Sequence, residues 1–189
     1  MYKKLKKESL EKNIPIIEDE TLMFLIDFIN NNDIKNVLEI GSAVGYSAIN
    51  MAGLCDVSID TIERDEERYK MALKNIEKYN LTKNINIFNI DAFDFKVDKK
   101  YDLIFIDAAK SQNINFFERF KNNLSDNGFI ITDNLNFHGM LDADYESLSK
   151  NVKGLVRKLN LYIKFLEENK DYETKFLNIG DKISISTKK

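Results

Sequence analysis

Two acids and an amide stand at the ends of two apolar runs in the second half of the chain. Asp107 ends the run YDLIFID, and Asp133 ends the run GFIITD with Asn134 directly after it. If the two runs are neighbouring strands, three oxygen ligands meet in one place. Two carboxylates and a carboxamide form a hard site suited to Mg²⁺, with Mn²⁺ as the alternative ion. From spacing alone, two unrelated aspartates that cap the helices after their strands explain the pattern equally well.

Lys110 follows Asp107 by three residues and would lie in the same cleft. An amine beside a bound substrate hydroxyl can act as the general base that takes the hydroxyl proton. The sequence therefore makes Lys110 a candidate catalytic residue. The alternative interpretation is a solvated lysine at the start of a helix.

A second group of residues, in the first half of the chain, has the order expected of a nucleoside site. Gly41 and Gly45 follow the run NVLEI and would let the backbone approach a ligand closely. Glu63 ends the next run and could accept two hydrogen bonds from a ribose diol, while Asp91 and Ala92 follow the third run and could meet an adenine ring. The spacing is neither a dinucleotide fingerprint nor a P-loop. The glycines alone fit a tight turn equally well, but three such strand ends together indicate a nucleoside-bearing cofactor.

The elements that must position these residues alternate along the chain. Short β-branched or aromatic runs predict strands at residues 36–40, 58–62, 85–90, 101–107 and 128–133. Segments of helical spacing lie between them at about 46–54, 66–79 and 114–124. This alternation predicts the α/β class, with a Rossmann-like, doubly wound, mainly parallel sheet and helices on both faces.

The two ends of the chain complete this fold. A helix over residues 19–31 should cover the sheet, and a long amphipathic helix is expected over about 150–169. Gly180 and Asp181 supply a tight turn between two runs rich in Ile, Phe and Thr. We therefore expect the sheet to have seven strands and to finish with a C-terminal antiparallel hairpin.

Length and composition favour one globular domain spanning residues 1–189. Hydrophobic residues make up 43% of the chain and charged residues 31%, which is not the composition of a disordered protein. The net charge of −3 argues against a general polyanion binder, although a local basic face could exist. No apolar run approaches the roughly 20 residues needed to span a bilayer. With the single Cys55, which excludes an intramolecular disulfide, this predicts a cytoplasmic protein without membrane contact.

These residues also carry a resemblance. The segments VLEIGSAVGYS, IERDEERY, IDAAKSQ and ITDN, in this order, are similar to those of the catechol and caffeoyl-coenzyme A O-methyltransferase family of class I S-adenosylmethionine-dependent methyltransferases. The likeness runs over nearly the whole chain. It is closest to the bacterial tRNA 5-hydroxyuridine methyltransferases, whose tail resembles residues 153–186 here.

The resemblance implies S-adenosylmethionine and Mg²⁺ as cofactors. The methionine part of the cofactor would lie against residues 39–47, the ribose against Glu63 and the adenine against Asp91 and Ala92. The residues that it assigns to the cofactor are Glu39, Gly41, Ser42, Gly45, Tyr46, Ser47, Glu63, Asp91, Ala92 and Asp107. It makes Asp107, Asp133 and Asn134 the metal ligands and Lys110 the catalytic base.

Two acceptors compete for the methyl group. Lysines and arginine crowd two helices and could hold the phosphates of tRNA while a 5-hydroxyuridine enters the cleft; they are Lys3, Lys4, Lys6, Lys7 and Lys12, and Lys150, Lys153, Arg157, Lys158 and Lys164. On charge alone a solvated helix face explains them equally well, and the resemblance of the tail favours tRNA. The alternative is a small catechol or phenol in an aromatic pocket to which Phe137 and Tyr145 could contribute.

A non-catalytic nucleotide-binding regulator on the same fold is a further alternative, and it would bind cofactor without needing a metal. Enzymes of this family often pair, so a homodimer is expected by analogy. The single histidine, His138, follows the fifth predicted strand as a loop residue and is given no role.

Overall fold

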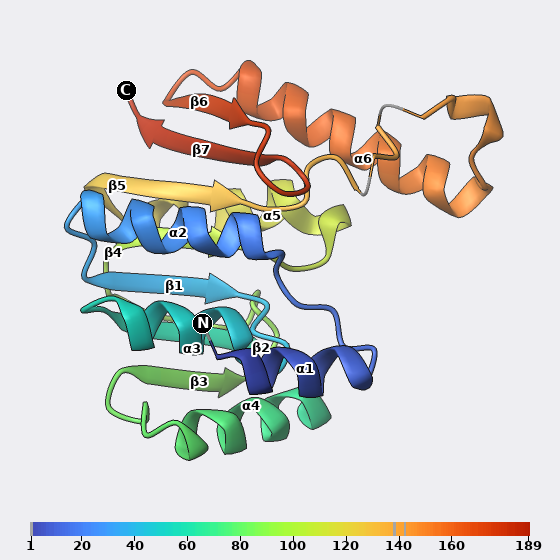
Figure 1. The fold of residues 1–189 in the computed structure, drawn as a ribbon. Coiled ribbons are helices and arrows are strands. Elements are labelled where there is room, and N and C mark those ends of the chain that lie inside the picture. Colours follow the sequence, from blue (N-terminus) through green and yellow to red (C-terminus); the bar gives the residue numbers. More distant parts are fainter. Residues whose placement is uncertain (1, 138, 142) are drawn as a thin grey trace.

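A seven-stranded sheet forms the centre of the protein, as a computed structural model shows for residues 2–137, 139–141 and 143–189 (Figure 1). His138 lies outside these described residues. The strands are β1 (Asn36–Ile40), β2 (Ser58–Glu63), β3 (Ile85–Asn89), β4 (Tyr101–Ile106), β5 (Leu124–Thr132), β6 (Tyr172–Leu177) and β7 (Ile183–Lys188). Their order across the sheet is β3-β2-β1-β4-β5-β7-β6.

The first five strands are parallel, and β7 runs antiparallel to both β5 and β6. The predicted α/β fold, a Rossmann-like and mainly parallel sheet that ends in an antiparallel hairpin, is therefore confirmed. The order of the strands reverses between β1 and β4, which are hydrogen-bonded neighbours. Ligands of such sheets bind at this point, beyond the carboxyl ends of the strands.

Helices cover both faces of the sheet. They are α1 (Lys3–Glu11), α2 (Asp19–Asn31), α3 (Tyr46–Leu54), α4 (Glu66–Lys78), α5 (Asn113–Phe120) and α6 (Lys150–Glu167), with short 3₁₀ turns at η1 (Lys110–Gln112), η2 (Lys121–Asn123) and η3 (Tyr145–Ser147). None of these helices in the described part of the chain is long and apolar enough to cross a membrane.

Two hydrophobic clusters lie on opposite faces because successive strand residues point to opposite sides. In β1, Val37 belongs to the cluster under α1, α2, α3 and α4, whereas its neighbour Leu38 belongs to the cluster under α5 and α6. Figure 1 shows α2 in front of the sheet and α5 behind it. The sheet is thus buried on both faces, and its strand ends are the places left for a ligand.

The fifth strand differs from its predicted bounds. It begins at Leu124, where we expected the end of a helix, and α5 ends earlier, at Phe120. Leu124 is fully buried and pairs with Tyr101 at the start of β4. The next pair between the two strands is Leu103 with Phe129, so the polar residues Ser125 to Gly128 form an irregularity inside β5. Their composition resembles a turn, and only the pairing of Leu124 before them makes them part of the strand.

Candidate active site

A cleft of about 780 Å³ opens at the carboxyl ends of the parallel strands, around the point where strand order reverses. Residues from both predicted groups line it together. From the cofactor group these are Gly41, Glu63, Asp91, Ala92 and Asp107, and from the chemical group Lys110 and Asn134. The residues predicted to bind the nucleoside of the cofactor and the candidate base therefore line the same cleft.

The glycine loop after β1 packs directly against the end of β4. Gly41 has a φ of +101°, and a Cβ atom placed on it would lie 2.3 Å from the backbone oxygen of Asp107. Only glycine fits a backbone of this conformation at this distance. The close approach brings the cofactor loop beside the residue that is also the first predicted metal ligand.

Glu63 is held rigidly at the end of β2. Its Oε2 accepts a hydrogen bond from the backbone N–H of Ala43 at 2.9 Å, and its Oε1 accepts one from Asp65 N–H at 2.8 Å. The residue is only 7% exposed but lines the cleft. A carboxylate fixed in this way presents its remaining lone pairs to the cleft, where a ribose diol could donate to them.

Glu39 lies behind the cleft surface, fully buried. The hydroxyl of Ser47 and the hydroxyl of Thr61 each donate to its carboxylate at 2.5 Å. Burial is the main reason that the pKa of Glu39 rises to about 7. None of Glu39, Ser42, Gly45, Tyr46 and Ser47 is among the residues that line the cleft. These residues belong to the glycine loop and its supports and do not line the cleft surface, so their contact with a cofactor stays a prediction.

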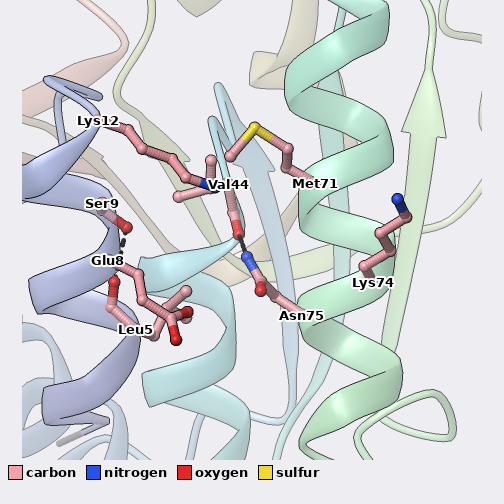
Figure 2. A pocket seen from close by; sticks show the side chains of 8 residues that line it. All are labelled: Leu5, Glu8, Ser9, Lys12, Val44, Met71, Lys74 and Asn75. Carbon is pink, nitrogen blue, oxygen red and sulfur yellow. Dashed lines mark hydrogen bonds between the residues drawn. The ribbon is translucent and has the colours of Figure 1, made fainter.

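A smaller pocket, of about 190 Å³, lies between α1 and α4 on the outer side of the glycine loop (Figure 2). Here the side-chain amide of Asn75 donates to the backbone oxygen of Val44 at 2.9 Å. This bond ties α4 to the glycine loop and so stabilises the wall of the cleft. None of the residues predicted for the cofactor, the metal ion or catalysis lines the smaller pocket, but Lys12 of the predicted basic group does.

Asp107 is the contact point of the polar cluster at the ends of β4 and β5. Its Oδ1 accepts hydrogen bonds from Lys110 Nζ and from Asn134 Nδ2, each at 3.1 Å. Asp133 accepts from the backbone N–H of Asn134 at 2.6 Å and is 2% exposed. The structure therefore brings together all four residues that sequence analysis assigned to metal binding and catalysis.

Two acids close together, the buried Asp133 and the partly exposed Asp107, favour a cation. Burial first, and the negative charge of Asp107 second, raise the pKa of Asp133 to about 7. Among the described residues no group of three or more His, Cys, Asp or Glu side chains could hold a metal ion. The predicted set contains only two acids, with Asn134 as the third ligand. An amide flip would turn its oxygen toward Asp107, and the set then suits a hard dication.

Several residues that line the cleft were missed by sequence analysis. Arg64 and Arg68 reach it from the end of β2 and from α4, and both lie in the quoted segment IERDEERY. Phe93 and Phe116 also line it and stack with ring centroids 5.1 Å apart. No local pattern signals this stack, because the two rings come from different parts of the chain.

The two aromatic residues suggested for an acceptor pocket lie in different surroundings. Phe137 lines the cleft. Tyr145 is 45% exposed, is not among the lining residues and has the Lys153 ammonium 5.1 Å from its ring centre.

Known structures identify the class of this fold. The crystal structure of an O-methyltransferase from Bacillus cereus in complex with S-adenosylhomocysteine superposes with a TM-score of 0.82 over 99% of this chain and 90% of that chain, at 23% identity. This is the class I methyltransferase fold. A family model described as O-methyltransferase matches residues 1–189, so the chain belongs to the O-methyltransferase family.

Two proteins of higher sequence identity indicate which type of O-methyltransferase this is. Caffeoyl-CoA O-methyltransferase 1 of Nicotiana tabacum is 31% identical over 89% of this chain and 74% of its own length. A crystal structure of a proposed caffeoyl-CoA O-methyltransferase from Staphylococcus aureus is 36% identical, with a TM-score of 0.94 over 99% of this chain and 91% of that one. The protein is thus an S-adenosylmethionine-dependent O-methyltransferase of the caffeoyl-CoA O-methyltransferase type, and the resemblance to this family is confirmed. The closer likeness to the bacterial tRNA enzymes stays a prediction.

Proposed function

We propose that this protein uses a divalent metal ion, Mg²⁺ or alternatively Mn²⁺, to methylate the 5-hydroxyl of hydroxyuridine in tRNA. The observation that carries the proposal is the double contact of Asp107 Oδ1 with Lys110 Nζ and Asn134 Nδ2, in the cleft that Glu63 and Ala92 also line. A candidate base, candidate metal ligands and a candidate ribose acceptor thereby share one space.

Some residues of the cleft would bind the cofactor and the metal ion, and another would accept a proton. When bound, S-adenosylmethionine supplies an activated methyl group and Mg²⁺ supplies a Lewis acid that activates a hydroxyl. Glu63 would hold the ribose, and Asp91 with Ala92 the adenine. Asp107, Asp133 and Asn134 would hold the metal ion.

Lys110, as the neutral amine, would receive the proton of the acceptor hydroxyl at Nζ; its side chain extends from η1 to Asp107, which supports this role. The sulfonium cofactor brings its own leaving group, so no covalent bond between enzyme and substrate is needed. The cleft residues then contribute mainly by alignment of the two reacting atoms.

The position of the basic helices supports a nucleic-acid acceptor. Leu10 of α1 and Ile14 directly after it line the cleft, and α6 packs against η1, which carries Lys110. In Figure 1, α1 and the first half of α6 lie toward the end of the sheet where β1 and β5 finish, on either side of it. Helix α1 thus borders the cleft through Leu10, and α6 is next to it through its packing on η1.

Not all of these cations are available to phosphates. Lys6 pairs with Asp19, Lys7 with Glu11, Lys153 with Glu146 and Lys164 with Glu168. In the described ranges, Arg157 and Lys158 of α6 have no carboxylate within 4 Å. The same holds there for Lys3, Lys4, Lys12 and Lys150. Arg157 and Lys158 are exposed neighbours on α6, and we take them as candidates for phosphate contacts.

A small phenolic acceptor is the second candidate, and the aromatic lining of the cleft favours it. Phe116 and Phe137 both face the cleft and could hold a flat ring. The tobacco relative is named for caffeoyl-CoA.

One assay separates the two acceptors. Methyl transfer would be measured with bulk tRNA from a strain that lacks the gene, and in parallel with a panel of catechols. We expect transfer to the tRNA that weakens as salt is added. An Arg157→Glu, Lys158→Glu variant should have a higher KM for tRNA and a weaker salt dependence than wild type. Transfer to catechols alone would overturn the tRNA assignment and leave the O-methyltransferase assignment standing.

A further inference from the structure

We propose that the turn between β6 and β7 (residues 178–182) is a positioning element of the active site, which fixes Asn134 through the loop after β5 and is itself set in place by α2. This inference rests on the proposed metal-dependent function, because it concerns one of the candidate metal ligands. None of the turn residues 178–182 lines the cleft, so the role we assign to them is positioning.

Asn134 needs support from outside its own loop. Its φ is +59°, in the left-handed region that residues other than glycine rarely adopt. Such conformations persist where the surrounding structure holds them. Asn134 N–H donates to Asp133, and its side chain reaches Asp107, so the backbone conformation decides where the amide lies.

The next two residues of the loop are bonded to the hairpin turn. Leu135 N–H donates to the backbone oxygen of Lys182 at 2.8 Å, and Asn136 N–H donates to that of Asp181 at 2.9 Å. Leu135 is fully buried, and Asp181 is 7% exposed. Figure 1 shows the turn, in red, beside the chain that leaves β5. A shift of the turn would therefore carry residues 135 and 136 with it and move Asn134.

The first turn of α2 sets the position of the hairpin turn. The carboxylate of Glu20 accepts a hydrogen bond from Gly180 N–H at 3.2 Å. A Cβ atom on Gly180 would lie only 2.2 Å from the hydroxyl oxygen of Thr21. That hydroxyl is buried and has no hydrogen-bond partner among the described residues. Thr21 therefore packs so closely against Gly180 that position 180 has no room for a side chain.

This contact can be tested with two substitutions, of which the second should reverse the effect of the first. Gly180→Ala should push the turn away from α2, whereas adding Thr21→Ala removes the obstructing oxygen and leaves the same backbone strain at residue 180. Thr21→Ala alone serves as the matched control. Two readouts apply: the steady-state constants for methyl transfer, and the hydrogen exchange of the Leu135 and Asn136 amides by NMR without added metal.

We expect Gly180→Ala to lower kcat on the order of tenfold or more, with the KM for S-adenosylmethionine within about twofold of wild type. The exchange of both amides should accelerate, and the double variant should recover both properties. Unchanged amide exchange in Gly180→Ala, faster exchange with unchanged kcat, or no recovery in the double variant would each overturn the proposal.

A second pair of variants covers the case in which Gly180→Ala does not fold. Glu20→Ala removes the acceptor for Gly180 N–H, and Glu20→Gln retains an oxygen at that place, so only Glu20→Ala should accelerate exchange and lower kcat. Equal behaviour of the two variants would contradict the proposal. If wild type shows no metal-dependent turnover, the proposed function fails, but amide exchange still decides whether the turn holds the loop.

Discussion

Asn134 and Asp107 are 27 residues apart in the chain, yet the amide of Asn134 donates to the carboxylate of Asp107 at 3.1 Å. The contact exists because β4 and β5 are parallel neighbours and pair Ile106 with Thr132. Strands in this register end at the same edge of the sheet. The residues that follow them, Asp107 and Asp133, are therefore brought to one place.

Substitution of Asn134 separates the role of its side chain from that of its backbone. Both Asn134→Ala and Asn134→Gly remove the amide, so both should lower metal-dependent turnover at least about tenfold. Only alanine bears the cost of the left-handed conformation, so urea unfolding should find the alanine variant less stable than the glycine variant by about 1 kcal/mol. Normal turnover in Asn134→Gly would remove this residue from the site.

Lys110 should matter for the chemical step and not for cofactor binding. Lys110→Ala is expected to lower kcat on the order of 10²- to 10⁴-fold, because it removes the candidate base. The affinity for S-adenosylmethionine, measured by calorimetry, should stay within about twofold. Lys70→Ala is a suitable control, since Lys70 pairs with Glu66 on the surface of α4. A Lys110 variant as active as this control would refute the assignment.

Glu39 should give stability a pH dependence. Its pKa is about 7 in the folded protein against 4.5 for an ordinary glutamate in water, so between these values the folded state keeps a proton that the unfolded chain has lost. The stabilising contribution is complete below about pH 4.5 and is lost as the pH rises through about 7.

Glu39→Gln removes this titration but retains the shape of the side chain. The free energy of unfolding of wild type, minus that of the variant, should fall on the order of 1–3 kcal/mol between about pH 4.5 and pH 8. Urea unfolding across this range measures it. Parallel curves for the two proteins would show that Glu39 does not titrate there.

Gly41 should be the less replaceable of the two loop glycines. Gly41→Ala adds both left-handed strain and a clash with the backbone of Asp107, for a loss of about 2–4 kcal/mol. Gly45→Ala meets its nearest neighbour, Ala72 Cβ, at 3.4 Å and should lose only about 1 kcal/mol from strain. Chemical denaturation of both variants tests the order, and equal losses would count against the close approach of β1 to β4.

Local patterns predicted the regular elements well. The helix expected at residues 46–54 and the one at 19–31 have these bounds in α3 and α2. Helical spacing is a property of neighbouring residues and can be read without the rest of the chain. The early start of β5 could not be read in this way, because Leu124 becomes a strand residue by pairing with Tyr101.

The sequence indicated which polar residues meet at the strand ends, whereas their roles in binding and catalysis stay predictions. Strand ends with acids, an amide and a lysine could be found in the sequence, and the structure gathers them. The burial of Glu39 behind the loop was not predicted, since it depends on Thr61 of the neighbouring strand. The contact of the β6–β7 turn with Leu135 joins residues 47 positions apart, and no local pattern indicates it.

We propose that Asp107, Asp133 and Asn134 hold a divalent ion on which turnover depends. The most direct test measures methyl transfer with added Mg²⁺ and again with excess chelator, while S-adenosylmethionine binding is followed in both samples. We predict that the chelator lowers turnover at least about a hundredfold and leaves cofactor binding unchanged. Equal turnover in the two samples would show that methyl transfer does not depend on a divalent ion.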